Sequence, residues 1–184
     1  MKAVGFIGSP RKGGSTEILV NEILAGASEK GAQIAVYNVT ELNIKGCKAC
    51  YSCRDRIGCI LKDDMQKLYE EINKASAVVF GSPIYMWQMS GQMKLFIDRL
   101  LPFQNPGSPL KKGKRKDLIL AFTQGQTDSA LFMPYYESTG EMLEVLGFNI
   151  KGLIVAPGVD EKGGVLKQKD TLKKARMMGR DLFN

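Results

Sequence analysis

The sequence predicts an α/β domain built on a doubly wound, five-stranded parallel sheet with helices on both faces. Two observations predict this fold. Short apolar runs alternate along the 184 residues with segments in which apolar residues recur at helical spacing. The apolar runs also lack the alternation of apolar and polar residues that marks a strand exposed on one face, so parallel strands covered on both sides are expected. No internal repeat interrupts the order, and residues 1–184 are expected to form one domain.

The elements follow one another in βα order. The first strand is the apolar run at residues 2–8, and a helix follows from Ser15 to about Glu29. The other strands are expected at 32–39, within 75–83, at 117–124 and at 148–156. The other helices are expected at 63–74, 90–101, 130–147 and 167–182, with a surface loop at 103–116. This order fits a flavodoxin-like sheet, in which ligands bind beyond the carboxyl ends of the strands.

Composition narrows the classes of function. The chain has no histidine, which excludes a Ser-His-Asp triad, a Cys-His nucleophile pair and a His-bound metal. No apolar run approaches the roughly 18 residues of a membrane span. The apolar stretch at the amino terminus is also too short for a signal peptide. We therefore expect a cytoplasmic protein with reduced thiols and no membrane partner.

The net charge of +7 is concentrated in two places, Lys111–Lys116 and Lys167–Arg176. No basic stripe is interleaved with aromatic residues, so no nucleic-acid partner is expected. Our first interpretation is that both runs form solvent-exposed surface. Docking of an acidic electron donor is the alternative.

The loop after the first strand, Gly8–Thr16, has the residues of an anion site. Glycines allow close backbone approach, and the amides at the start of the next helix attract negative charge. Ser9, Ser15 and Thr16 add hydroxyl groups, and Arg11 adds a planar charged fork. The loop lacks the lysine of a nucleotide-triphosphatase loop and the dinucleotide fingerprint. A terminal phosphate monoester such as that of FMN fits it, and a tight surface turn is the alternative.

The loop after the third strand, Gly81–Lys94, carries Tyr85, Met86, Trp87 and Met89 at the ligand end of the sheet. Loops rarely expose this much apolar surface without binding a ligand, so a ligand with a flat ring system is expected here. The alternative is that these side chains cover a core or a subunit interface. The loop at 123–128, after the fourth strand, has small polar residues suited to the other edge of the same ring.

Together these loops resemble the NAD(P)H-dependent FMN reductase group of the flavodoxin-like superfamily. The segment GCKACYSCRDRIGCILKDDM further resembles the iron–sulfur flavoproteins of anaerobic archaea and bacteria. The resemblance implies FMN, a [4Fe–4S] cluster beside it, and a homodimer or homotetramer with flavin near the subunit interface. It assigns the phosphate to Ser9, Arg11, Ser15 and Thr16. It assigns the ring to Pro83, Ile84, Tyr85, Met86 and Trp87 on one side and to Thr123, Gln124 and Gly125 on the other.

All four cysteines lie in a loop expected at 46–62, with the spacing C-x2-C-x2-C-x5-C at Cys47, Cys50, Cys53 and Cys59. A cubane cluster needs four converging thiolates, which this spacing can supply. Positive charges at Lys48, Arg54 and Arg56 would offset the charge of the cluster. Zinc also accepts four thiolates, although usually from two separated pairs. A cysteine loop without metal is the third interpretation.

The functional hypothesis is an FMN-dependent oxidoreductase that moves electrons from ferredoxin or NAD(P)H to an unknown acceptor, with a [4Fe–4S] cluster as one-electron partner. No side chain is expected to act as a nucleophile. One alternative is a plain NAD(P)H:FMN or quinone reductase without a cluster. Another is a non-catalytic electron carrier or redox sensor that docks its partner at the basic Lys111–Lys116 run.

Overall fold

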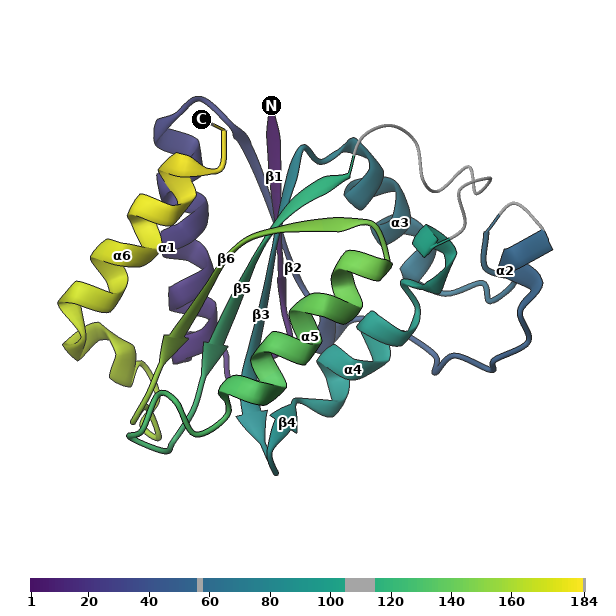
Figure 1. Ribbon diagram of the computed structural model, residues 1–184. Helices are drawn as coiled ribbons and strands as arrows, with labels where there is room; N and C mark the ends of the chain where they lie inside the picture. Colours follow the sequence, from purple (N-terminus) through teal and green to yellow (C-terminus); the bar gives the residue numbers. More distant parts are fainter. Residues whose placement is uncertain (56–57, 105–114, 184) are drawn as a thin grey trace.

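A parallel sheet forms the centre of the molecule in a computed structural model that describes residues 1–55, 58–104 and 115–183 (Figure 1). The strand order is β2-β1-β3-β5-β6, and every neighbouring pair in it is parallel. The strands are β1 (Lys2–Ile7), β2 (Gln33–Asn38), β3 (Ala77–Tyr85), β5 (Lys116–Thr123) and β6 (Phe148–Ala156). The predicted five-stranded, doubly wound sheet is thereby confirmed.

Helices cover both faces of this sheet. They are α1 (Ser15–Glu29), α2 (Ser52–Asp55), α3 (Met65–Lys74), α4 (Gly91–Asp98), α5 (Met133–Val145) and α6 (Lys169–Asp181), with 3-10 turns at Val39–Glu41, Leu101–Gln104 and Gly164–Lys167. Figure 1 shows α1 and α6 on one face and α3, α4 and α5 on the other. The short helix α2 projects beyond the second layer as part of the cysteine loop. Among the described helices, none is long and apolar enough to cross a membrane.

The two faces of the sheet have different cores. Aromatic rings fill the side of α3, α4 and α5, where Phe6 stacks on Phe96 at 4.8 Å between ring centroids and meets Phe80 edge-on at 5.6 Å. Aliphatic and small side chains fill the side of α1 and α6. There Gly26 and Gly179 allow the two helix backbones to touch, because a Cβ at Gly179 would lie 1.8 Å from the carbonyl oxygen of Ile23.

The segment after β3 differs from the expected loop. Strand β3 continues to Tyr85, and β4 (Gln88–Met89) turns back to pair with it in antiparallel register. The hairpin adds a sixth, short strand outside the parallel path of the sheet. The sequence has no hairpin signal here, because Met86 and Trp87 stand where a two-residue turn normally has asparagine and glycine. The pairing of Ile84 with Met89 and of Tyr85 with Gln88 forms the hairpin.

Several boundaries also differ from the expected ones. Helix α3 begins at Met65, two residues later than expected, because the Asp63 carboxylate accepts the Met65 amide at 3.1 Å and stays outside the helix. The expected helix at 90–101 ends at Asp98 and gives way to a 3-10 turn. The cysteine loop contains one helical turn, α2.

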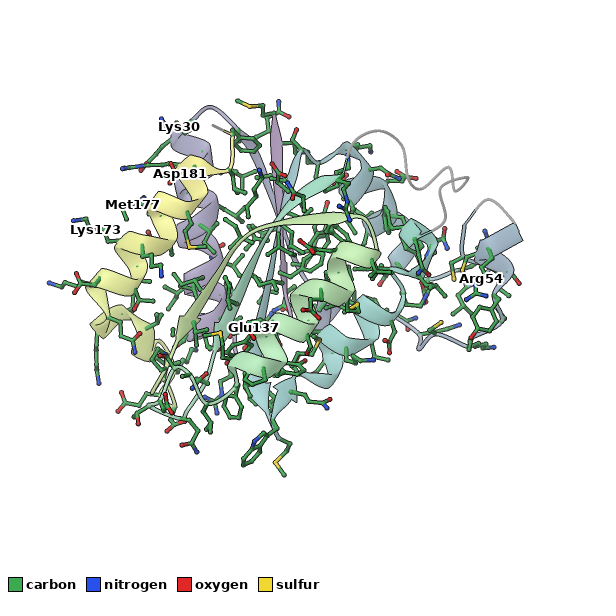
Figure 2. All side chains as sticks on the ribbon, viewed as in Figure 1. Lys30, Arg54, Glu137, Lys173, Met177 and Asp181 are labelled. Atoms are coloured by element: carbon green, nitrogen blue, oxygen red, sulfur yellow. The ribbon has the colours of Figure 1, made fainter. Side chains whose placement is uncertain are left out.

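The two basic runs are placed differently. Residues 111–114 of the Lys111–Lys116 run lie outside the described residues, while Arg115 donates to the Glu144 carbonyl and Lys116 to the Asn73 carbonyl at 2.9 Å. Most of the carboxyl-terminal run lies within α6, whose Lys173 and Met177 point away from the sheet in Figure 2. In that run, Arg176 forms an ion pair with Glu29 at 3.1 Å.

Candidate functional site

The loop between β1 and α1 begins at the carboxyl end of β1, which lies between β2 and β3 in the sheet. The Gly8 amide donates to the carbonyl of Gly81 at 2.8 Å, which fixes the start of the loop beside the middle of β3. The N-cap of α1 is Gly14, which offers no side-chain acceptor to the first-turn amides. Ser15 and Thr16 are buried in that first turn. An uncapped helix start with buried hydroxyl groups is suited to an anion.

The polar side chains of this loop also connect it to its neighbours. The hydroxyl groups of Thr16 and Thr123 are 2.7 Å apart, which ties α1 to the end of β5. The Arg11 guanidinium donates to the backbone carbonyl of Asp160 at 2.8 Å. Arg11 is therefore held at the rim, on the segment after β6, with donors of its guanidinium fork remaining beyond this bond.

The β3–β4 hairpin presents a strained, exposed turn. Met86 and Trp87 have φ values of 45° and 69°, in the left-handed region that asparagine and glycine normally occupy in a two-residue hairpin. Their side chains are 90% and 66% exposed. Trp87 packs edge-on against Phe132 with 5.7 Å between ring centroids. The strain and the exposed apolar surface at one place indicate a functional surface.

Hydrogen bonds hold the hairpin in place. The Met89 amide donates to the Tyr135 hydroxyl at 2.9 Å. Ser90 caps α4 by accepting from the Met93 amide at 3.1 Å, and its hydroxyl donates to the Gly8 carbonyl at 2.5 Å. The hairpin, α4 and the first loop thus form one connected edge of the site.

The segment after β5 contributes backbone more than side chain. Gln124 is buried, and its side-chain oxygen accepts from the Tyr136 hydroxyl at 2.6 Å. Its side-chain nitrogen donates to the carbonyls of Gln126 at 3.0 Å and Asp128 at 2.8 Å. Gln124 therefore shapes the loop internally. Gly125 lies against the Asp160 carboxylate, whose oxygen would be 2.0 Å from a Cβ at that position.

These segments enclose one cavity of about 340 Å³ at the carboxyl ends of the strands. The volume lies within the range of about 300–1,000 Å³ that is typical of small-molecule sites. All twelve residues expected at a cofactor line it: Ser9, Arg11, Ser15, Thr16, Pro83, Ile84, Tyr85, Met86, Trp87, Thr123, Gln124 and Gly125. The structure brings them together from three loops that are distant in the sequence.

The cavity also has walls that the sequence analysis did not include. They are Phe132, Val159, Asp160 and Glu161, whereas Gln126, which also lines the cavity, belongs to the loop expected at 123–128. Residues 159–161 follow β6, whose carboxyl end lies at the same edge of the sheet as those of β1, β3 and β5. The rule that ligands lie beyond the carboxyl ends of strands would have found them had it been applied to the last strand.

The four cysteines line a second, smaller pocket. Cys47 and Cys50 are exposed, Cys53 is buried and Cys59 is half-buried. The backbone turns in the left-handed region at Ala49 and Tyr51, on either side of Cys50. Among the described residues, no three Cys, His, Asp or Glu side chains are already grouped to hold a metal ion. The loop therefore gathers the thiols without closing a ligand set.

The two central thiols have opposite electrostatic environments. Hydrogen bonds from the backbone and side chain of Ser52 lower the pKa of the Cys50 thiol. Burial raises the pKa of Cys53, and the neighbouring thiols raise it further. Arg54, one of the cations expected to offset cluster charge, lies over the Tyr51 ring at 4.2 Å, while Arg56 lies outside the described residues. Figure 2 shows Arg54 on the projecting part of the cysteine loop.

A buried ion pair anchors the cysteine loop to the domain. Asp63 and Arg99 have side chains that are each 1% exposed, and they form two hydrogen bonds, of 2.6 and 3.1 Å. Asp63 also accepts the Lys45 amide at 3.0 Å, and Arg99 donates to the Lys45 carbonyl at 2.7 Å. Burial opposes the charge on Asp63, but these hydrogen bonds, led by that of Arg99, keep its pKa below the ordinary value. Sequence analysis missed this pair.

Taken together, the fold and the cavity define a flavodoxin-like protein with a cofactor-sized site at the carboxyl edge of its sheet. The sequence profile of NADPH-dependent FMN reductases matches residues 1–126, and the chain belongs to that family of oxidoreductases. An iron-sulfur flavoprotein of Archaeoglobus fulgidus is 31% identical over 97% of this chain and 77% of its own length. An iron-sulfur flavoprotein of Methanocaldococcus jannaschii is 40% identical, but the match spans 54% of this chain and half of that protein.

Solved structures agree on the fold. An NAD(P)H:quinone oxidoreductase from Methanothermobacter marburgensis superposes with a TM-score of 0.77 over the whole chain and 96% of its own, at 18% identity. An FMN-dependent NADH-azoreductase from Bacillus anthracis, in complex with FMN, gives a TM-score of 0.69 over all of both chains at 14% identity. At these identities the likeness establishes the architecture alone.

Proposed function

We propose that the chain is an FMN-dependent oxidoreductase whose flavin occupies the 340 Å³ cavity. One observation carries the proposal: three loops expected from the sequence to hold the phosphate and the two sides of the ring all line that one cavity. The uncapped start of α1 supports a phosphate, and the exposed hairpin supports a flat apolar ring.

The proposed roles follow the positions of the residues. Ser9, Ser15 and Thr16 would bind the phosphate with the first amides of α1, and Arg11 would add charge at the rim. Residues 83–87 would cover one side of the ring, and residues 123–125 would contribute the other side, largely through backbone. When bound, FMN supplies both hydride and single-electron chemistry. The protein's own work is to orient the ring, exclude water with Trp87 and Phe132, and stabilise reduced charge with backbone amides.

We further propose that Cys47, Cys50, Cys53 and Cys59 hold a [4Fe–4S] cluster. The donor set fits, because four thiols line one pocket and the chain has no histidine. The names of the archaeal relatives support the same assignment. Loading requires the exposed Cys47 and Cys50 to turn toward the two inner thiols. The cluster would supply single-electron transfer beside the two-electron chemistry of the flavin.

Helix α4 connects the two proposed sites. Its N-cap, Ser90, contacts the first loop of the cavity, and Arg99 just after its end lines the cysteine pocket. Eight helical residues at 1.5 Å each separate the two ends by about 12 Å. The proposed reaction takes electrons from NAD(P)H or ferredoxin and passes them to an acceptor that the site does not specify.

A plain NAD(P)H:FMN or quinone reductase is the second candidate. The observation that favours it is that the described residues form no closed metal-ligand group. An electron carrier or sensor that docks at the Lys111–Lys116 run is a third, although most of that run lies outside the described residues. Rapid bleaching of the flavin by NADPH would favour the reductase, and reduction only by a low-potential protein donor would favour the carrier.

The deciding experiment is to purify the protein without oxygen and to measure FMN, iron and acid-labile sulfide. We expect one FMN per chain and about four irons and four sulfides. FMN without iron or sulfide would refute the cluster and leave the reductase. Protein that lacks flavin and does not bind added FMN would refute the proposed function as a whole.

We also propose a homodimer or homotetramer, because the Met86–Trp87 turn exposes apolar surface beside the cavity. Sedimentation equilibrium of the flavin-loaded protein tests this assembly. A monomer at micromolar concentration would refute it.

A further inference from the structure

Arg99 is a buried cation with one nitrogen unused. Its side chain is 1% exposed, and Nη1 and Nη2 are engaged by the Asp63 carboxylate and the Lys45 carbonyl. The Nε atom is fully buried and has no hydrogen-bond partner among the described residues. A buried donor without an acceptor is costly and uncommon, so an unpaired guanidinium N–H needs an explanation.

The same side chain lines the pocket of the four cysteines. The remaining walls include the apolar Ile60, Leu61, Leu101 and Pro102, and two charged residues, Lys48 and Asp98, also line the pocket. The Nε atom itself is buried away from the exposed mouth of the pocket, and an anionic group is a strong partner for such a donor. A group held by thiolates would present anionic sulfur at this place.

Neighbouring groups hold Arg99 beside Cys59. The Tyr69 hydroxyl donates to the Arg99 carbonyl at 2.7 Å, which fixes the backbone at the end of α4. Asp63 fixes the plane of the guanidinium through two bonds, so the direction of the Nε–H is set before any ligand is present.

We propose that Arg99 donates a hydrogen bond from Nε to a sulfur atom of the metal–sulfur group held by Cys47, Cys50, Cys53 and Cys59. This inference rests on the proposed cluster and adds a residue outside the cysteine motif to its site. Asp63 is a positioning residue that acts through Arg99. Hydrogen bonds to cluster sulfur stabilise the more negative, reduced state, so Arg99 raises the reduction potential of the group and slows its loss.

The test compares Arg99→Lys with the wild-type protein after anaerobic purification. Lysine retains a positive charge that can pair with Asp63. It has no counterpart of the Arg99 Nε–H, which points in a different direction from the donors that bind Asp63. The double variant Asp63→Asn/Arg99→Gln removes both charges together and so avoids an unpaired buried charge. Arg180→Lys is the matched control, because Arg180 pairs with Glu29 on the surface of the α1–α6 layer.

Three quantities are measured. The first is the content of FMN, iron and sulfide, and the second is the reduction potential of the iron–sulfur signal, from a redox titration monitored by electron paramagnetic resonance. The third is the rate of iron release to a chelator. We expect wild type and Arg180→Lys to be indistinguishable. Both Arg99 variants should keep their FMN, show a lower potential, and lose iron about tenfold faster.

The outcomes separate this inference from the proposed function. Wild-type protein with FMN but without iron and sulfide would refute the cluster and, with it, the role of Arg99. A loaded wild type with unchanged potential and iron release in both Arg99 variants would overturn the inference alone. If Arg99→Lys does not fold, the double variant still decides the question.

Discussion

The contact between α1 and α6 gives a quantitative prediction for Gly179→Ala. A Cβ at this position would lie 1.8 Å from the carbonyl oxygen of Ile23 and 2.8 Å from its carbonyl carbon. Gly26 makes the reciprocal approach, with a Cβ 2.0 Å from the carbonyl oxygen of Arg176. These neighbours are backbone atoms, so no side-chain rotation can relieve the overlap.

The magnitude follows from the geometry. Real Cβ contacts essentially never fall below 3.0 Å, so the gap at Gly179 must open by 3.0 − 1.8 = 1.2 Å. Opening it separates the buried side chains of α1 from α6, and overpacking of this kind costs about 1–3 kcal/mol. Alanine recovers only about 1 kcal/mol through its helix propensity. We therefore expect a net loss of up to about 2 kcal/mol, or up to about 8 °C in Tm.

Thermal unfolding followed by circular dichroism measures this effect, and Gly140→Ala is the matched control. Gly140 also lies within a helix, but a Cβ there would be 3.8 Å from the nearest atom, a side-chain carbon of Ile150. Helix propensity then acts alone, and the variant should gain about 0.4–1 kcal/mol. The two substitutions should thus shift Tm in opposite directions. A gain in Tm for Gly179→Ala equal to that of Gly140→Ala would refute the close helix contact.

Three further predictions concern the two sites. Thr16→Val removes the hydroxyl that contacts Thr123 and should weaken FMN binding about tenfold in a fluorescence titration. Thr16→Ser should restore most of the affinity, and equal affinities in all three proteins would contradict the assignment. Met86→Asn should raise the urea midpoint slightly, because asparagine tolerates the φ of 45° better than methionine; a lower midpoint would argue against the turn. The pair of Asp63 and Arg99 should lose its stabilising effect as the pH falls below about 4, because the folded pKa of Asp63 lies below its unfolded value. Urea unfolding at several pH values should therefore be less acid-sensitive in Asp63→Asn than in wild type, and parallel pH profiles would exclude that contribution.

Most of the fold could be predicted because its signals are local. Apolar runs and helical periodicity identified each strand of the parallel sheet and the main helices. The β3–β4 hairpin was missed because Met86 and Trp87 are unusual residues for a two-residue turn. Its geometry is imposed by packing on Phe132 and by the hydrogen bond from Met89 to Tyr135, which are contacts made far along the chain.

The candidate site divides in the same way. Loops at the carboxyl ends of strands could be located from strand order alone, and so the twelve expected residues line one cavity. The direction of each side chain could not be predicted. Gln124 turns inward to Tyr136, and Arg11 binds the segment after β6, because partners more than ten residues away along the chain compete for their polar groups.

By itself, the sequence determined the order of strands and helices, the loops that meet at the ligand edge, and the clustering of four thiols in one segment. Those properties depend on spacing along the chain. Only the tertiary structure decided that Asp63 and Arg99 meet, that Arg99 lines the cysteine pocket, and that its Nε atom is buried without a partner among the described residues. Residues 36 positions apart become partners through packing of the intervening elements, and no local pattern in the sequence encodes that meeting.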